Sequence, residues 1–375
     1  MEEIRKIADR AAEQLATYPA VTGKEKVKRL IKAGLLRQKL APADSFSWPN
    51  AMLGEGLLAA FEATGEKRYL QAVADYLNRW KKAGYPIHYV DNIMNGWLAL
   101  WISSLLDGSC VKPLCNLQQR REMKELCLEV QEACADWVRA AAKTERGILP
   151  YRNHHPGWGF ADTLGMVCPF LCRYGAEHSD KELLRQGIGQ LLLFQECGMD
   201  PVTGLPYHGY EEKTGMKYGI IGWGRACGWM MKGLAESLPW IPAEEKGYQE
   251  LLTLFRQLSC AVMKYQRPDG GFSWQLEALE GHCDTSAEGM IGAALIRGLK
   301  SGLLRDEKNA PPSGMQEKTQ SILTGLTGAV CASLEDGVVK NCSGECTGFA
   351  EYPQRYGSYP WGTGSVLEFL SYHKR

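Results

Sequence analysis

Apolar and amphipathic helical segments alternate along most of this 375-residue chain. A nearly uncharged helix is buried on most of its sides, whereas an amphipathic helix buries only one face. The apolar segments begin near residues 50, 91, 162, 225, 285 and 361. The amphipathic segments cover residues 2–17, 67–82, 117–141, 180–196, 244–265 and about 315–332. Such a repeat indicates apolar helices packed inside a layer of amphipathic ones.

Six helix pairs of this kind predict an all-α fold, an (α/α)6 barrel of six inner and six outer helices. A closed ring also explains a single domain over residues 1–375, although one core usually stops growing at about 250–300 residues. The alternative is an open α-solenoid. Neither end of the chain shows a capping repeat with a polar outer face, which favours closure. Residues 337–360, rich in Gly, Cys and Tyr, are interpreted as a short hairpin or lid.

Charge and cysteine usage exclude several classes of protein. The 43 Lys and Arg residues balance 43 Asp and Glu residues, so no basic stripe suggests nucleic acid or an anionic membrane as a partner. No apolar run approaches the roughly 18 residues of a membrane span. The charged start, Met1–Lys6, lacks the apolar core of a signal peptide. The 13 cysteines are scattered without a CxxC pair, which predicts reduced thiols in a cytoplasmic protein.

Polar and aromatic residues gather where the apolar segments begin. In a closed barrel these starts meet at one end, where free N–H groups and helix dipoles favour an anion. The stretch Gly159–Met166 puts Asp162 at the head of its helix, and Asp91 heads another. Two carboxylates, an arginine, histidines and tryptophans suit an anionic sugar. The candidate substrate contacts are Trp48, Asn92, Arg152, His208, Trp223, Arg225, Trp229, Thr285, Ser286 and Trp361.

Each candidate also has an ordinary structural interpretation. Asp162, Asp91 and Asp284 can simply cap helices, because Asp oxygens accept the free N–H groups of a first turn. The pair His154–His155 has no third ligand at a useful spacing, so no metal and no other cofactor is predicted. Further structural alternatives are an ion pair at Arg225, an ordinary loop histidine at His208 and core packing at Trp229.

Five motifs in register resemble the unsaturated rhamnogalacturonyl hydrolases of glycoside hydrolase family 105 and, more loosely, the unsaturated glucuronyl hydrolases. The resemblance runs from about residue 45 to the C-terminus. Its motifs are Asp162-Thr163-Leu164-x-Met166 with Pro169-Phe170-Leu171, His208-Gly209-Tyr210-Glu211, Trp223-Gly224-Arg225-x-x-Gly228-Trp229, Asp284-Thr285-Ser286 and Pro360-Trp361-Gly362-Thr363-Gly364.

Two positions depart from the pattern of these families. Phe160, a further predicted contact, stands where they usually carry Trp. Arg225-Ala226-Cys227-Gly228-Trp229 replaces their usual Arg-Gly-Asn-Gly-Trp. These departures concern the details of substrate contact more than the reaction.

The resemblance implies a cytoplasmic enzyme that acts after a polysaccharide lyase, on a sugar with a C4=C5 double bond. Asp162 would protonate C4 and then activate water for C5. Asp91 would tune Asp162 or hold hydroxyls, and Arg225 would bind the uronate carboxylate. Rhamnogalacturonan or pectin fragments are the expected substrate; glycosaminoglycan fragments are an alternative. An ordinary inverting glycosidase and a non-catalytic sugar-binding protein also stay open. The sequence predicts neither the aglycone nor an oligomeric state.

Overall fold

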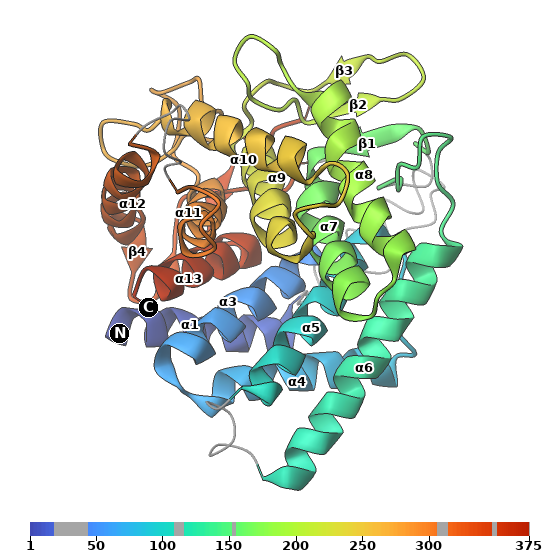
Figure 1. The fold of residues 1–375 in the computed structure, drawn as a ribbon. Helices are drawn as coiled ribbons and strands as arrows, with labels where there is room; N and C mark the ends of the chain where they lie inside the picture. Colours follow the sequence, from blue (N-terminus) through green and yellow to red (C-terminus); the bar gives the residue numbers. More distant parts are fainter. Residues whose placement is uncertain (19–43, 109–115, 152–154, 306–313, 347–350, 375) are drawn as a thin grey trace, which may run out of the picture.

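The inner layer of the protein is a closed ring of apolar helices (Figure 1). The computed structural model describes residues 1–18, 44–108, 116–151, 155–305, 314–346 and 351–374. Within these ranges the inner helices are α3 (Trp48–Thr64), α5 (Met94–Asp107), α7 (Ala161–Glu177), α9 (Gly224–Ser237), α11 (Thr285–Lys300) and α13 (Pro360–His373). Each packs against the next, and α13 packs against α3, so the ring closes. The predicted (α/α)6 barrel is confirmed.

Amphipathic helices surround this ring at the periphery of the molecule (Figure 1). They are α1 (Glu2–Thr17), α4 (Lys67–Lys82), α6 (Leu117–Ala140), α8 (Lys181–Gly198), α10 (Tyr248–Met263) and α12 (Met315–Ala332). Helix α1 packs against α3, α4 and α13. The first helix of the chain, α1, therefore belongs to the outer layer and lies against α13, the last helix of the inner ring.

The first pair of inner and outer helices, α3 and α4, shows how the sequence determines which helix lies in which layer. Every residue of α3 from Trp48 to Phe61 is buried, in keeping with its nearly uncharged sequence. Helix α4 buries Tyr69, Val73, Tyr76 and Trp80, which recur every three or four residues and form one stripe. The charged side chains of α4 fall between these positions and face solvent.

Short antiparallel strands connect some of the helices. The strand β1 (Trp158–Phe160) pairs with β2 (Gly209–Glu211), which pairs with β3 (Lys217–Tyr218). Two further ladders join β4 (Leu334–Glu335) to β5 (Val338–Val339), and β6 (Cys342–Ser343) to β7 (Tyr356–Gly357). The hairpin predicted within residues 337–360 thus takes the form of the β6–β7 ladder. A short 3₁₀ helix, η2 (Leu238–Trp240), ends α9.

One predicted helix start differs in the structure. Asp91 lies in a 3₁₀ helix, η1 (Val90–Ile93), which precedes α5. The Asn92 side-chain oxygen accepts hydrogen bonds from the backbone N–H groups of His88 and Tyr89 and tightens this turn. No helix in the described ranges is both long and apolar enough to cross a membrane.

Candidate active site

Aromatic side chains from three inner helices meet where those helices begin. The Trp48 ring, at the start of α3, lies 4.9 Å from Trp361 of α13 and 6.0 Å from Trp229 of α9, between centroids. The three rings are almost fully buried. The predicted convergence of helix starts at one end of the barrel is therefore seen for these three helices.

Asp162 lies in the first turn of α7 but does not cap that helix. The N-cap residue is Phe160, which is also the last residue of β1. The strand leads directly into the helix, and the Ala161 N–H donates to the His208 carbonyl over 2.9 Å. The interpretation of Asp162 as a mere helix cap is therefore wrong, because a strand residue occupies that position.

The Asp162 carboxylate faces an imidazole. Its Oδ2 lies 3.2 Å from His208 Nε2, with 13% of the Asp162 side chain exposed. In this conformation the buried Oδ2 accepts no hydrogen bond from the described residues, although His208 Nε2 lies close enough to donate one. The register of β1 with β2 pairs Phe160 with Gly209 and so brings His208 to this place. The two predicted residues are adjacent.

His208 lies in an aromatic cage. Its ring centroid is 4.3 Å from that of Trp223, and Phe160 meets the same ring edge-on at 5.6 Å. On the side of Nδ1, the Tyr352 hydroxyl lies 3.2 Å away. His208 is only 4% exposed, so it is a buried member of the site rather than an ordinary loop histidine.

Asp91 and Asn92 occupy the neighbouring helix start. Asp91 is buried in η1, which packs against α7, the helix that carries Asp162. The N-cap residue of η1 is Tyr89, so Asp91 does not cap it either. The Asn92 amide donates to the Asp44 carboxylate and the Phe46 carbonyl. Asn92 thereby fixes the loop before α3.

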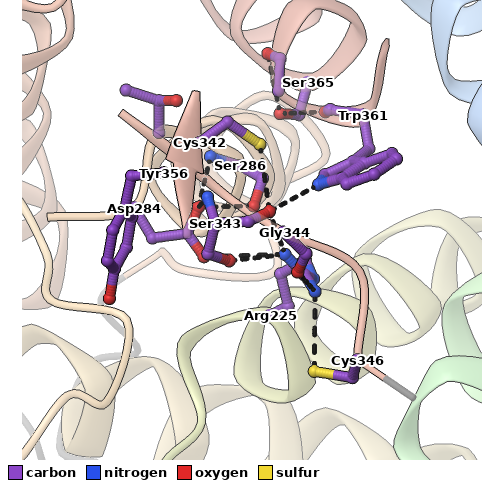
Figure 2. A network of polar contacts seen from close by, with 12 residues as sticks. Arg225, Asp284, Ser286, Cys342, Ser343, Gly344, Cys346, Tyr356, Trp361 and Ser365 are labelled. Carbon is purple, nitrogen blue, oxygen red and sulfur yellow. Dashed lines mark hydrogen bonds and ion pairs between the residues drawn. The ribbon is translucent and has the colours of Figure 1, made fainter. Parts of the chain in front are cut away.

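Arg225 lies beneath the segment that follows β6 (Figure 2). Its Nη1 donates to the Ser343 carbonyl over 2.9 Å, and its Nη2 donates to the Gly344 carbonyl over 2.8 Å. The guanidinium lies 3.9 Å from Asp284 and over the Trp223 ring. Burial, the largest influence, lowers the pKa of Arg225, but nearby acidic groups raise it overall, with Asp284 first among them.

Asp284 is a structural residue. It caps α11 by accepting from the Ser286 N–H, and it also accepts from the Ser343 N–H and hydroxyl (Figure 2). The capping interpretation of Asp284 is confirmed. Arg225 and Asp284 together hold Ser343 of β6.

Three other residues predicted to contact the substrate form hydrogen bonds within the protein in this conformation. Thr285 donates to the Lys340 carbonyl, Ser286 to the Asp284 carboxylate, and the Trp361 Nε1 to the Ser343 carbonyl. Their direct contact with a sugar stays a prediction. Arg152 and His154 lie outside the described residues.

One site residue was missed by the sequence interpretation. Tyr352 contacts His208 from the segment between β6 and β7. The signal available was the tyrosine-rich run Glu351–Tyr359 inside the predicted hairpin.

Known proteins match this chain over most of its length. It is 24% identical over 338 residues to an unsaturated rhamnogalacturonyl hydrolase, YesR, of Bacillus subtilis, an alignment that covers 87% of this chain and 89% of that protein. It also resembles a Clostridium (C. acetobutylicum) glycoside hydrolase from family 105, with a TM-score of 0.70 and 20% identity over 92% of this chain and 98% of the other.

A second solved structure and a family model complete the comparison. The unsaturated glucuronyl hydrolase of Bacillus sp. GL1 gives a TM-score of 0.63 at 17% identity, over 88% of this chain and 87% of that one. At these identities the two structures support the fold alone. The model of Glycosyl Hydrolase Family 88 matches residues 24–374, and on this match the chain belongs to that family.

Proposed function

We propose that this protein removes a 4,5-unsaturated uronic acid from the non-reducing end of lyase-generated oligosaccharides. The observation that carries the proposal is Asp162, a partly exposed carboxylate in the first turn of an inner helix, beside an imidazole. Membership of the family and the relative that acts as an unsaturated rhamnogalacturonyl hydrolase support the same conclusion. A single carboxylate is sufficient for hydration of a double bond, whereas ordinary glycosidases need a pair.

The reaction begins with proton transfer from the Asp162 carboxyl to C4. The C4=C5 electron pair forms the new C–H bond, and the positive charge at C5 is shared with the ring oxygen. Asp162, now a carboxylate, takes a proton from water as the water oxygen bonds to C5. The resulting hemiketal opens by breaking the bond between C5 and the ring oxygen. The hemiacetal left at C1 then releases the aglycone and becomes an aldehyde.

The remaining groups are proposed to bind and orient the sugar. Asp91 would supply a second carboxylate for hydroxyl groups, from an element packed against α7. Arg225 would meet the uronate carboxylate once the carbonyls of residues 343 and 344 release the guanidinium. The further proposed contacts are Trp48, Asn92, Arg152, Phe160, His208, Trp223, Trp229, Thr285, Ser286 and Trp361.

We further propose that the substrates are rhamnogalacturonan or pectin fragments. The reaction would take place in the cytoplasm, and the whole chain would act as one catalytic domain. The name of the Bacillus subtilis relative supports the substrate class. The described cysteines are all free thiols, which suits a reducing compartment. Glycosaminoglycan fragments are the second candidate, because one structural neighbour degrades them.

The test is to mix the enzyme with oligosaccharides from a rhamnogalacturonan lyase and, separately, from a glycosaminoglycan lyase. We expect loss of the ultraviolet absorbance of the conjugated double bond, faster with the first set. In heavy water, the opened product should carry deuterium at C4. Cleavage of saturated oligosaccharides would instead indicate an ordinary inverting glycosidase, and binding without turnover a sugar-binding protein.

The variant Asp162→Asn should lose at least the roughly 10²–10⁴-fold that general acid–base catalysis contributes. Asp162 caps nothing, so the replacement removes no helix cap. Asp180→Asn is the matched control, because Asp180 caps α8 and Asn also caps well. Near-full activity of Asp162→Asn, or a product without deuterium at C4, would refute the mechanism.

A further inference from the structure

The Tyr352 hydroxyl lies on the opposite side of the His208 ring from Asp162. It is 3.2 Å from His208 Nδ1, while His208 Nε2 is 3.2 Å from Asp162 Oδ2. The backbone N–H of Ile220 donates to the same hydroxyl over 3.2 Å. Four groups from separate parts of the chain therefore form a row that ends at the proposed catalytic carboxylate.

The position of Tyr352 is determined by its surroundings. Its ring centroid lies 5.6 Å from that of Trp223 and 5.9 Å from that of Trp274. On either side of it in the chain, Ser343 accepts from Arg225 and pairs with Tyr356 in the β6–β7 ladder. Burial raises the pKa of the Tyr352 phenol, so the hydroxyl keeps its proton near neutral pH.

When Asp162 is ionised, the hydrogen bonds along this row favour one of the two neutral forms of His208. A neutral imidazole has one N–H and one acceptor nitrogen. With the proton on Nδ1, the Nε2 lone pair would face a carboxylate oxygen, and two acceptors would repel each other. With the proton on Nε2, the imidazole can donate to Asp162, and Nδ1 can accept the Tyr352 hydroxyl proton. The Ile220 N–H donates to that hydroxyl and therefore does not compete for the hydroxyl proton.

We infer that Tyr352 is a positioning residue that holds His208 in its Nε2–H form, so that the imidazole donates to Oδ2 of Asp162. This inference rests on the proposed function of Asp162. It gives the two carboxylate oxygens of Asp162 different roles. Oδ2 is kept as an acceptor from His208, and Oδ1 is left to carry the proton to C4 and to take one from water.

The first test is the protonation of His208 in the free enzyme. Long-range ¹H–¹⁵N correlation spectra distinguish the two neutral forms, and the signals of His208 are those lost in His208→Gln. We expect an Nε2–H pattern in the native protein and a mixture of both forms in Tyr352→Phe. The control, Tyr356→Phe, removes a hydroxyl that donates to Gln354 on the same segment and should leave the pattern unchanged.

The second test is turnover. Tyr352→Phe should lower kcat by roughly three- to tenfold, the range of one hydrogen bond, with KM changed less and with an altered pH profile of kcat. A native Nδ1–H pattern, or a Tyr352→Phe variant with an unchanged pattern, overturns the inference even if kcat falls. The spectra need no substrate, so this failure is separate from failure of the proposed function, which an active Asp162→Asn would show.

Discussion

At the scale of single residues, Arg225 has two possible partners. In this conformation its two terminal nitrogens donate to the carbonyls of Ser343 and Gly344. A bound uronate carboxylate would have to replace those carbonyls. A carboxylate adds its own negative charge and a bidentate geometry, which neutral carbonyls do not offer, so it can compete for the guanidinium. Binding of the substrate and loss of the hydrogen bonds from Arg225 to Ser343 and Gly344 would then be one event.

Arg225→Lys tests whether the arginine meets the carboxylate. Lysine keeps the charge but loses the planar fork. We expect KM for the unsaturated uronate to rise by about tenfold or more, because a hydrogen bond to a charged group contributes roughly 1.5–3 kcal/mol. The measurement is steady-state kinetics from the loss of ultraviolet absorbance.

The methyl ester of the same uronate is the matched control substrate. If Arg225 binds the carboxylate, the native enzyme should discriminate strongly against the ester, and Arg225→Lys should discriminate much less. An equal loss for acid and ester would assign Arg225 to the anchoring of residues 343 and 344 alone.

The site residues that could be predicted from the sequence are those that stand in a recognisable short motif. Asp162 stands in a short motif that begins a predicted helix, and His208 stands in a second short motif. The partners of Arg225 and His208 could not be predicted in the same way. Ser343 is 118 positions from Arg225, and Tyr352 is 144 positions from His208, and both arrive on a segment without regular helical spacing.

At the scale of elements, α3 and α13 close the ring by unusually tight contact. A Cβ added to Gly56 would lie 2.6 Å from the Gly364 carbonyl oxygen, and one added to Gly364 would overlap the Met52 carbonyl. Both obstacles are backbone atoms, which cannot rotate away. The two glycines therefore allow the first and last inner helices to meet.

Gly364→Ala should accordingly destabilise the protein, although alanine favours helices. Overpacking typically costs about 1–3 kcal/mol. Gly189→Ala, on the outer helix α8, is the control, because an added Cβ there meets nothing within 4 Å. It should instead stabilise by roughly 0.5–1 kcal/mol. Urea unfolding measures both, and a Gly364→Ala variant at least as stable as the native protein would contradict the close packing.

The helices themselves follow closely from the periodicity of the sequence. The helix predicted over 67–82 is α4, and that over 117–141 differs from α6 by one residue. The 3₁₀ turn before α5 was not predictable, because it depends on Asn92. That side chain is held by the Asp44 carboxylate and the Phe46 carbonyl, on a loop far away in the sequence.

At the scale of the whole molecule, closure of the ring follows from the repeat, whereas the ionisation of its buried carboxyls does not. Glu288 of α11 is 1% exposed, and its Oε1 accepts from the Phe272 N–H over 3.0 Å. Burial, with smaller contributions from Asp284 and Asp269, raises the pKa of Glu288 to about 8. That residues 1–375 act as one catalytic domain stays a prediction.

The raised pKa of Glu288 makes the stability of the fold depend on pH. Between about pH 4.5, the ordinary pKa of a glutamate side chain, and about pH 8, the folded protein keeps a proton that the unfolded chain has lost. Stability from this group is therefore complete below pH 4.5 and is lost as the pH rises toward 8, at up to roughly 1.4 kcal/mol per pH unit.

Glu288→Gln removes this titration and keeps an oxygen for the Phe272 N–H. The stability of the variant relative to the native protein should thus increase between pH 5.5 and 7.5, by up to about 2–3 kcal/mol on the same scale. Urea unfolding at several pH values measures the difference. Glu317→Gln, at an exposed position of α12, is the control for the same substitution outside the core. A constant difference for Glu288→Gln would mean that Glu288 is ionised in the folded protein at neutral pH.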